Sequence, residues 1–280
     1  MALKEQARDR HVSAALNNLP NAITKRQLLV FDLETTGLDV KTDRIVQFGI
    51  AGFSNSKEFG RGQDTLINPC RAIPQEVSAI HGIYDEDVKD VDSFGTIGGS
   101  FEKTLSSPNG VLLAGYNAVN FDTPLLNAEF ARHGFGFKVD ADKVFDPLIW
   151  LKFSKRGLRS RKLSAVAEHY GIPFENAHRA SSDAQITGRI LFKLIEEKII
   201  PDDVEEALNA QKRIVDVLFR ENQMYGHFLY FDRENSESLR IGFGKHSGVL
   251  LSDAPVSYLR WILSLKDLPP LAVSAIREYA

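Results

Sequence analysis

Several common features are scarce or absent in this sequence. Its 280 residues include a single cysteine, Cys70, so the chain can form no internal disulfide. No hydrophobic run approaches the roughly 20 residues that a membrane-spanning helix needs. The charged start at residues 1–10 does not resemble a secretory signal. Since an unpaired cysteine is typical of reducing compartments, these shortages predict a cytoplasmic protein without a membrane segment.

An excess of basic charge is also missing. The chain has 34 Lys and Arg against 37 Asp and Glu, a formal net charge of −3, so no basic field covers the whole protein. Nucleic-acid binding is still compatible with this balance, because carboxylates that hold metal ions add to the negative total and are neutralised locally. The length is compatible with one large domain but favours a main domain with a smaller second one, and the 43% hydrophobic content is that of an ordinary globular protein.

The most informative stretch is residues 28–38, in which two carboxylates interrupt an apolar, strand-forming run. Asp32 and Glu34 stand two residues apart, so their side chains project from the same face of a strand. Two carboxylates on a buried strand repel each other and are costly to desolvate. A pair of divalent cations removes that cost, and Mg²⁺ and Mn²⁺ prefer oxygen ligands. The Thr-Thr-Gly that follows ends the strand and allows a ligand to approach closely.

The order of the expected elements indicates an α/β fold. Three strands with short links come first, which favours an antiparallel meander; the first begins at residue 28, and the others are expected at 44–53 and 64–69. An apolar run at 111–117 is typical of a strand buried on both faces. Helical periodicity predicts helices at 93–106, 121–133, 163–170 and 180–198. Together they imply a mixed sheet with helices on both faces.

A third carboxylate follows the strand predicted at 111–117. Asp122 falls in the first turn of the next helix, from which its side chain can turn back over the end of the strand. Asn120 is a candidate cap for that helix. The plain alternative is that Asp122 is only a favourable charge at a helix N-terminus. In isolation, that alternative explains Asp122 better.

The last element is His-Arg-Ala-Ser-Ser-Asp at residues 178–183. Asp183 falls in the first turn of another predicted helix, and His178 lies in the loop that leads into it. A lone histidine is more often an ordinary surface residue than a catalytic base. Four carboxylates at the ends of elements, together with one loop histidine, form a constellation that chance rarely assembles.

These motifs resemble those of the DEDDh (DnaQ-like) 3′→5′ exonuclease family. The similarity is carried by Phe-Asp-Leu-Glu-Thr-Thr-Gly-Leu at 31–38, Asn-x-x-x-Phe-Asp at 117–122 and His-x-x-x-x-Asp at 178–183. It extends over about residues 27–198 and implies a ribonuclease H-like fold, with a mixed five-stranded sheet flanked by helices. It also implies that His178 is the general base. The implied metal ligands are Asp32, Glu34, Asp122 and Asp183.

The chemistry implied by the resemblance is hydrolysis of a phosphodiester at a 3′ end. Two Mg²⁺ or Mn²⁺ ions stabilise the attacking and departing oxygens, and a neutral His178 removes the proton of the attacking water. The product is a nucleoside 5′-monophosphate. In the family, the residue matching Leu38 wedges against the terminal base; for Leu38 and Phe121, plain core packing is an alternative of nearly equal weight. The residues expected at the terminal nucleotide are Thr35, Thr36, Leu38, His81, Asn117 and Phe121.

A basic run lies at residues 152–162, which hold six basic residues and no acidic one. Such a run is usually a solvated face. Complete separation of charge next to a phosphodiester site favours contact with phosphates instead. The candidate contacts are Lys155, Arg156, Arg159 and Arg161.

The chain continues beyond the region of the resemblance. A helix from 201 to about 222, hairpin strands at 226–231 and 239–243, and a helix at 258–263 predict a small α+β domain. Phe-Gly-Lys-His-x-Gly, followed by Tyr-Leu-Arg-Trp, resembles the C-terminal domain of exodeoxyribonuclease X-like proteins. A glycine-flanked Lys-His turn can bind phosphate, although it can also be merely a tight turn beside a core tryptophan. The candidate phosphate contacts are Lys245, His246 and Arg260.

The sequence therefore predicts a helical N-terminal extension over 1–26, an exonuclease domain over 27–200 and a nucleic-acid-binding domain over 201–280. The predicted function is metal-dependent 3′→5′ exonuclease activity on DNA with a free 3′ end. One alternative is an RNA-directed exonuclease of the same fold. The other is a non-catalytic nucleic-acid- or polymerase-binding subunit. No membrane partner is expected, and association with a polymerase or a second copy cannot be read from the sequence.

Overall fold

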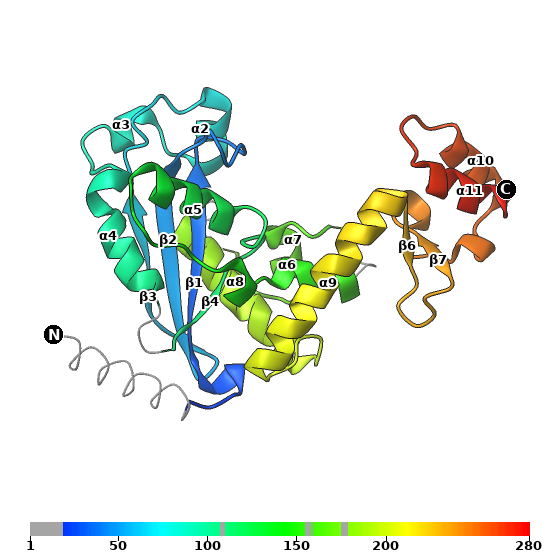
Figure 1. The fold of residues 1–280 in the computed structure, drawn as a ribbon, viewed down its shortest axis with the longest axis horizontal. Helices are drawn as coiled ribbons and strands as arrows, with labels where there is room; N and C mark the ends of the chain where they lie inside the picture. Colours follow the sequence, from blue (N-terminus) through cyan, green and yellow to red (C-terminus); the bar gives the residue numbers. More distant parts are fainter. Residues whose placement is uncertain (1–18, 107–109, 155–157, 159, 175–178) are drawn as a thin grey trace. The chain divides into compact units, whose positions relative to one another are not determined.

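The computed structural model describes residues 19–106, 110–154, 158, 160–174 and 179–280 (Figure 1). Residues 1–18, most of the helical N-terminal extension predicted over 1–26, lie outside the described residues. The chain divides into two compact units, one from Met1–Leu148 with Lys162–Asn209 and the other from Ile149–Arg161 with Ala210–Ala280. In the first unit, Asp202 and Asp203 hydrogen-bond with residues 21–24. The domain limits at 26 and 200 stay a prediction.

A five-stranded mixed sheet forms the centre of the first unit. Its order is β3-β2-β1-β4-β5; β1, β2 and β3 pair antiparallel, while β4 and β5 extend the sheet in parallel with β1. The strand bounds are β1 Gln27–Thr35, β2 Ile45–Ser54, β3 Lys57–Leu66, β4 Leu112–Ala114 and β5 Val144–Phe145. The three residues of β4 are apolar and buried, as expected of a strand covered on both faces. The predicted mixed five-stranded sheet is confirmed.

The third strand differs from its prediction. It begins at Lys57 and ends at Leu66, whereas the sequence predicted 64–69. A two-residue turn at Asn55 and Ser56, both with positive φ, joins β2 to β3; such turns match the twist of a hairpin. Most of β3 is exposed and polar. An edge strand of this kind lacks the apolar alternation on which the prediction depended.

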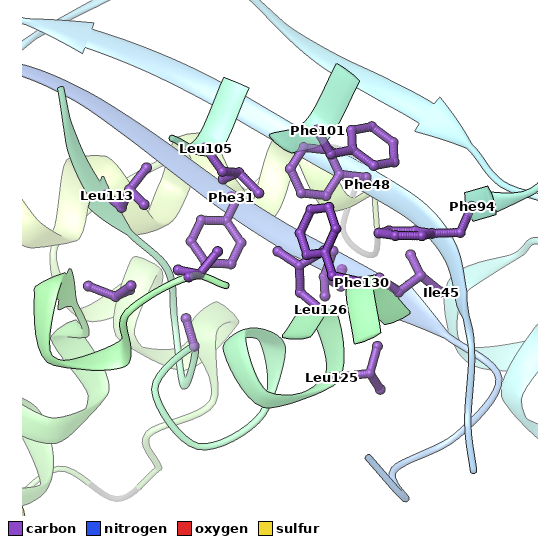
Figure 2. Close-up of a cluster of buried hydrophobic side chains, with 14 of the residues drawn as sticks. Phe31, Ile45, Phe48, Phe94, Phe101, Leu105, Leu113, Leu125, Leu126 and Phe130 are labelled. Atoms are coloured by element: carbon purple, nitrogen blue, oxygen red, sulfur yellow. The ribbon is translucent and has the colours of Figure 1, made fainter. Parts of the chain in front are cut away.

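Helices cover both faces of the sheet. Adjacent residues of a strand point to opposite faces, and on β2 Phe48 faces the main core while Gly49 faces α8. The main core is rich in aromatic rings from β1, β2, α4 and α5 (Figure 2). The helices that begin in this unit are α2 Gln75–His81, α3 Asp85–Val88, α4 Phe94–Leu105, α5 Asp122–Arg132, α6 Pro147–Ser154, α7 Leu163–His169, α8 Ala180–Glu196 and α9 Val204–Tyr225, with short 3₁₀ turns η1 Ile23–Lys25 and η2 Ala141–Lys143.

Helix α8 lies directly on the backbone of β2 because two glycines permit it. A Cβ at Gly49 would collide with the backbone of Ala180 and Ser181, and one at Gly188 would collide with the ring of Phe53. The first turn of α8 therefore rests on the sheet opposite Gly49. Because Gly49 pairs with Asp32 on β1, this contact brings the beginning of α8 beside the two carboxylates of β1.

The second unit has a core of its own. A short antiparallel hairpin packs with the last two helices around Leu229, Ile241, Leu259 and Ile276. Its elements are β6 Leu229–Phe231, β7 Leu239–Ile241, η3 Gly244–His246, η4 Leu251–Asp253, α10 Val256–Leu263 and α11 Pro270–Arg277. The predicted hairpin is confirmed, and so is the helix predicted at 258–263, which is α10. Helix α11 was not among the elements predicted from the sequence; it begins with proline, a residue that the first turn of a helix favours.

Across the described part of the chain, no helix has both the length and the apolar character needed to cross a bilayer.

Candidate active site

Three carboxylates from two elements meet at one end of the sheet. Asp32 and Glu34 come from the same face of β1, and Asp183 comes from the first turn of α8. One oxygen from each lies within 4.8 Å of the other two. Among the described residues, these three side chains form the group of His, Cys, Asp or Glu residues that is close enough to hold a metal ion. The structure thus joins residues that are about 150 positions apart in the sequence.

Asp122 adds a fourth carboxylate from the start of α5. Its side chain is only 4% exposed, and its Oδ1 accepts the backbone N–H of Leu33 at 3.1 Å. Leu33 stands between Asp32 and Glu34, so this bond fixes α5 to the strand that carries the other carboxylates. The prediction that Asn120 caps α5 is wrong, because Phe121 occupies the cap position and no side chain caps the helix there. The helix is held by Asp122 itself.

Burial and neighbouring carboxylates raise the pKa values of these acids. Burial, followed by the charges of Asp183 and Asp122, raises the pKa of Glu34 to about 8. Burial also raises the pKa of Asp122 to about 7, against the effect of its backbone hydrogen bonds. The pKa of Asp32 lies well above its usual range, first from burial and then from the neighbouring acids. Such a cluster has the negative charge and the oxygen donors that suit divalent cations, which favour the deprotonated form of each ligand.

Two side chains hold the first turn of α8 against the sheet. Gln47 on β2 accepts the backbone N–H of Ala180 at 3.0 Å. Asp64 on β3 accepts both the backbone N–H of Ser181 at 2.8 Å and its hydroxyl at 2.7 Å. These bonds satisfy donors that every helix leaves open at its start. They also fix the backbone two residues before Asp183, so Gln47 and Asp64 orient a candidate metal ligand.

Sequence reasoning missed these two residues. Asp32, Gly49 and Asp64 form one row across β1, β2 and β3, and this row could be recognised only from the correct register of β3. Asp146 follows β5, and no role was assigned to it from the sequence. Its buried carboxylate accepts the backbone N–H groups of Asn117 and Val119 at 2.9 and 3.2 Å. It thereby orders the loop between β4 and α5.

The residues expected at the terminal nucleotide occupy contrasting environments. Leu38 is 83% exposed, which excludes the core-packing alternative for this residue. Phe121 is partly buried against the main core, which agrees with the core-packing alternative for this residue. The hydroxyls of Thr35 and Thr36 donate within the turn, to Gly37 O at 2.6 Å and to Asp43 at 2.8 Å.

The other two members of that set lie in ordered local structure. His81 is buried at the end of α2, and its Nδ1 accepts the backbone N–H of Ile83 at 3.1 Å. Asn117 has a positive φ of 62°, in the loop that Asp146 orders.

Several candidate residues lie outside the described residues or in the second unit. His178, Lys155, Arg156 and Arg159 are outside the described residues. Arg161 belongs to the second unit, where its Nε donates to Leu151 O at 3.3 Å. Lys245 and His246 line a cavity of that unit, and Arg260 is exposed on α10.

The sheet order is that of a ribonuclease H-like fold, and a family comparison agrees with it. The chain belongs to the exonuclease family RNase_T, which is described as Exonuclease and matches residues 29–191. The resemblance to DEDDh exonucleases is thereby confirmed. The likeness of the C-terminal residues to exodeoxyribonuclease X-like proteins stays a prediction.

Relatives and solved structures agree with this assignment. The chain is 30% identical over 200 residues to a DNA polymerase III PolC-type protein of Oceanobacillus iheyensis, an alignment that covers 70% of this chain and 14% of that protein. It is 32% identical over 168 residues to DNA polymerase III subunit epsilon of Treponema pallidum, covering 59% of this chain and 74% of that protein. The zinc-bound complex of E. coli exonuclease I with single-stranded DNA shares the fold, with a TM-score of 0.55 at 20% identity over 71% of this chain and 44% of that one. This chain spans between 12% and 21% of the length of the first three curated relatives.

Proposed function

We propose that this chain is a metal-dependent 3′→5′ exonuclease that removes nucleoside 5′-monophosphates from DNA with a free 3′ end. The observation that carries the proposal is the convergence of Asp32, Glu34 and Asp183, with Asp122 beside them, where burial and neighbouring negative charges raise the pKa of the carboxyls. A folded protein rarely keeps such a cluster unless cations bind to it. A nuclease of this family requires that kind of site.

Two divalent ions, Mg²⁺ or Mn²⁺, fit this donor set, and Asp32, Glu34, Asp122 and Asp183 would hold them. When bound, such ions supply Lewis-acid stabilisation of the attacking and departing oxygens of a phosphodiester. The side chains of the chain do the positioning. Asp122 ties α5 to β1, while Gln47 and Asp64 tie α8 to β2 and β3, so ligands from three elements are kept at fixed spacing.

His178 is our proposed general base. It precedes Asp183 by five residues in the sequence, and a neutral imidazole is the side chain that most often accepts a proton from an attacking water. The exposed Leu38 is the proposed wedge at the terminal base. Thr35, Thr36, His81, Asn117 and Phe121 are proposed to form the rest of the nucleotide site.

DNA is the proposed substrate because of what the relatives are. The curated relatives include DNA polymerase III subunits, and the solved exonuclease I structure contains single-stranded DNA. An RNA-directed exonuclease of the same fold is the alternative that a substrate comparison tests. The complete set of carboxylates speaks against a non-catalytic subunit. A cytoplasmic location remains our expectation from the single cysteine, Cys70.

A side-by-side time course tests the proposal. Single-stranded DNA, duplex DNA and RNA of the same sequence, each labelled at the 5′ end, are incubated with the full chain and Mg²⁺, with EDTA as the control. We expect a ladder that shortens from the 3′ end on DNA, and none in EDTA. Degradation of RNA alone would transfer the assignment to RNA, and no degradation of any substrate in Mg²⁺ or Mn²⁺ would overturn the enzyme assignment.

A further inference from the structure

The second unit contains a cavity that the exonuclease chemistry does not use. Its volume is about 650 Å³, within the roughly 300–1,000 Å³ that is typical of small-molecule sites. It lies between the turn that follows β7 and the first turns of α10. The lining residues are Gly244, Lys245, His246, Pro255, Ser257, Tyr258 and Trp261. Of these described residues none is acidic, and two are cations or can become cations.

An aromatic surface forms one wall of this cavity. The indole of Trp261 packs against the rings of Tyr258 and Phe243, with centroid distances of 5.1 and 6.1 Å and interplanar angles of 31° and 29°. Trp261 is nevertheless 47% exposed. It is therefore supported by other rings and still presents apolar surface to solvent. The core-packing alternative for Trp261 does not apply, because core tryptophans are largely covered.

The cationic turn is built to lie close to that surface. Gly244 has a positive φ of 69°, and a Cβ there would collide with the hydroxyl of Tyr258. The glycine thus permits the Lys245–His246 turn to approach α10. The His246 ring contacts the Tyr258 ring at a centroid distance of 4.4 Å, and Lys245 Nζ lies 5.8 Å from the centre of that same ring. Positive charge and π surface are consequently held within one cavity.

We propose that this cavity binds one nucleotide of single-stranded nucleic acid, with its base stacked on Trp261 and its phosphate near Lys245. Stacking on an exposed indole requires an unpaired base, whose face is open. A phosphate beside the ring satisfies the ammonium group of Lys245, and His246 adds a second donor. A neutral peptide would use the apolar wall equally well but would leave Lys245 without an anionic partner. This assignment rests on the proposed function, because an exonuclease that retains its strand benefits from a second contact that performs no chemistry.

Intrinsic fluorescence can test the assignment on the full chain. The chain has two tryptophans, and Trp150 is only 4% exposed with its indole N–H donated to Gln211. Titration with a single-stranded oligodeoxythymidylate in EDTA, where hydrolysis is blocked, should quench the exposed Trp261 and leave the Trp150 signal. Trp261→Phe should bind with nearly wild-type affinity without that quenching, since phenylalanine keeps a stacking face.

Two further variants measure the contributions of the ring and the charge. Trp261→Ala should weaken binding about tenfold, the change that about 1.4 kcal/mol of stacking corresponds to. Lys245→Ala should lower the slope of log affinity against log salt by about 0.7, the value for one phosphate contact on a single strand. Lys266→Ala is the matched control, because Lys266 is an exposed lysine of the same unit outside the cavity. Circular dichroism verifies that each variant is folded.

The outcomes separate this assignment from the exonuclease proposal. Two outcomes overturn the cavity assignment alone. One is nucleotide release in Mg²⁺ without quenching of Trp261. The other is that the Trp261→Ala and Lys245→Ala variants bind the oligonucleotide as tightly as Lys266→Ala does. If the fluorescence of Trp261 changed with protein concentration and not with oligonucleotide concentration, a second copy of the chain would be the occupant, and the cavity assignment would be overturned. Quenching without release in Mg²⁺ or Mn²⁺ overturns the exonuclease proposal and leaves the nucleotide site in place.

Discussion

The first unit gathers negative charge from distant parts of the chain, whereas the second presents rings and positive charge from one short segment. Asp32 and Asp183 belong to a strand and a helix about 150 residues apart, and the whole sheet is needed to bring them within 4.8 Å. Lys245 and Trp261 lie within one segment of fewer than 20 residues. A site that holds cations needs a rigid frame against repulsion, while a site that grips a strand needs only an exposed ring and a nearby charge.

The contrast also concerns the direction in which the pKa values move. In the first unit, burial and neighbouring acids raise the pKa of Glu34 to about 8. In the second unit, hydrogen bonds from Asn235 and Arg240 lower the pKa of Asp232. The acids of the cluster in the first unit thus have raised pKa values, whereas Asp232 in the second unit is paired with Arg240.

Removal of a metal ligand is expected to have the largest effect. Asp183→Asn takes away one charge of the cluster while keeping the shape of the side chain, so nucleotide release should fall to the level measured in EDTA. Thermal stability without metal should be retained or increase, because repulsion among the carboxylates is reduced. Activity is measured as release of nucleotide from labelled single-stranded DNA at saturating Mg²⁺. If the variant kept wild-type turnover, Asp183 would not be a ligand that the reaction requires.

Loss of the proposed base is expected to have the next largest effect. A positioned general base contributes roughly 10²–10⁴-fold, so His178→Ala should lose activity by that order while still binding Mn²⁺. Because a histidine must be neutral to accept a proton and ordinarily titrates near pH ~6.5, the wild-type rate should rise with pH through that region. The variant should lack this rise. If its pH profile between 6 and 8 matched the wild type, another group would be the base.

Asp64 sharpens the distinction between a ligand and a residue that positions one. Asp64→Ala removes the acceptor for Ser181 and frees the first turn of α8, so kcat should fall about 10–100-fold, the loss typical of outer-shell partners of metal ligands. Asp64→Asn keeps an acceptor and should restore most of that loss.

Glu58→Ala is the matched control for Asp64. Glu58 is on the same strand and holds α8 through Arg189 at 2.7 Å, farther along the helix from Asp183. Its loss should leave kcat almost unchanged. Equal losses in Asp64→Asn and Asp64→Ala would mean that the negative charge, rather than the contact with Ser181, is what matters.

The effect of pH on stability is expected to be the smallest. The folded-state pKa of Glu34 is raised above its ordinary value of 4.5, so protonated Glu34 favours folding at low pH, and this contribution is lost as pH rises through about 8. In EDTA, the Tm of the first unit should therefore be lower at pH 8 than at pH 6, by about 2–4 °C for each kcal/mol lost. Asp122 acts in the same direction.

Two comparisons isolate the acidic cluster as the cause. Addition of Mg²⁺ at pH 8 should recover the lost Tm, and Glu34→Gln should show a smaller fall between pH 6 and pH 8 in EDTA. Calorimetry records the transitions. A metal-free Tm that is identical at pH 6 and pH 8 in both proteins would contradict the raised pKa of Glu34.

The sequence predicted the four converging carboxylates better than the contacts that hold their strands and helices together. Asp32 and Glu34 were recognisable because carboxylates in a buried strand are unusual, and Asp122 and Asp183 because each begins a periodic helix. Gln47 and Asp64 were not recognisable, since their role depends on which residues face each other across three strands. The exposed polar strand β3 carries no hydrophobic period, so its register could not be derived locally.

Capping was the other point at which local reasoning failed. Asn120 had the right chemistry for a cap, but α5 begins later and is anchored through Asp122 to the backbone of Leu33. Tertiary contacts of this kind override a local propensity. The exposure of Leu38 was likewise undecided in the sequence, because an isolated leucine after a strand can face either way.

The most direct test of the acidic site is the direction of degradation and its need for metal. Two single-stranded DNAs are compared in Mg²⁺, one with a protected 5′ end and one with a protected 3′ end, and the released products are identified by chromatography. We predict nucleoside 5′-monophosphates from the strand with the free 3′ end, almost none from the strand with the protected 3′ end, and none from either in EDTA. Equal release from the 3′-protected strand, or release that continues in EDTA, would contradict a metal-dependent 3′→5′ exonuclease built on Asp32, Glu34, Asp122 and Asp183.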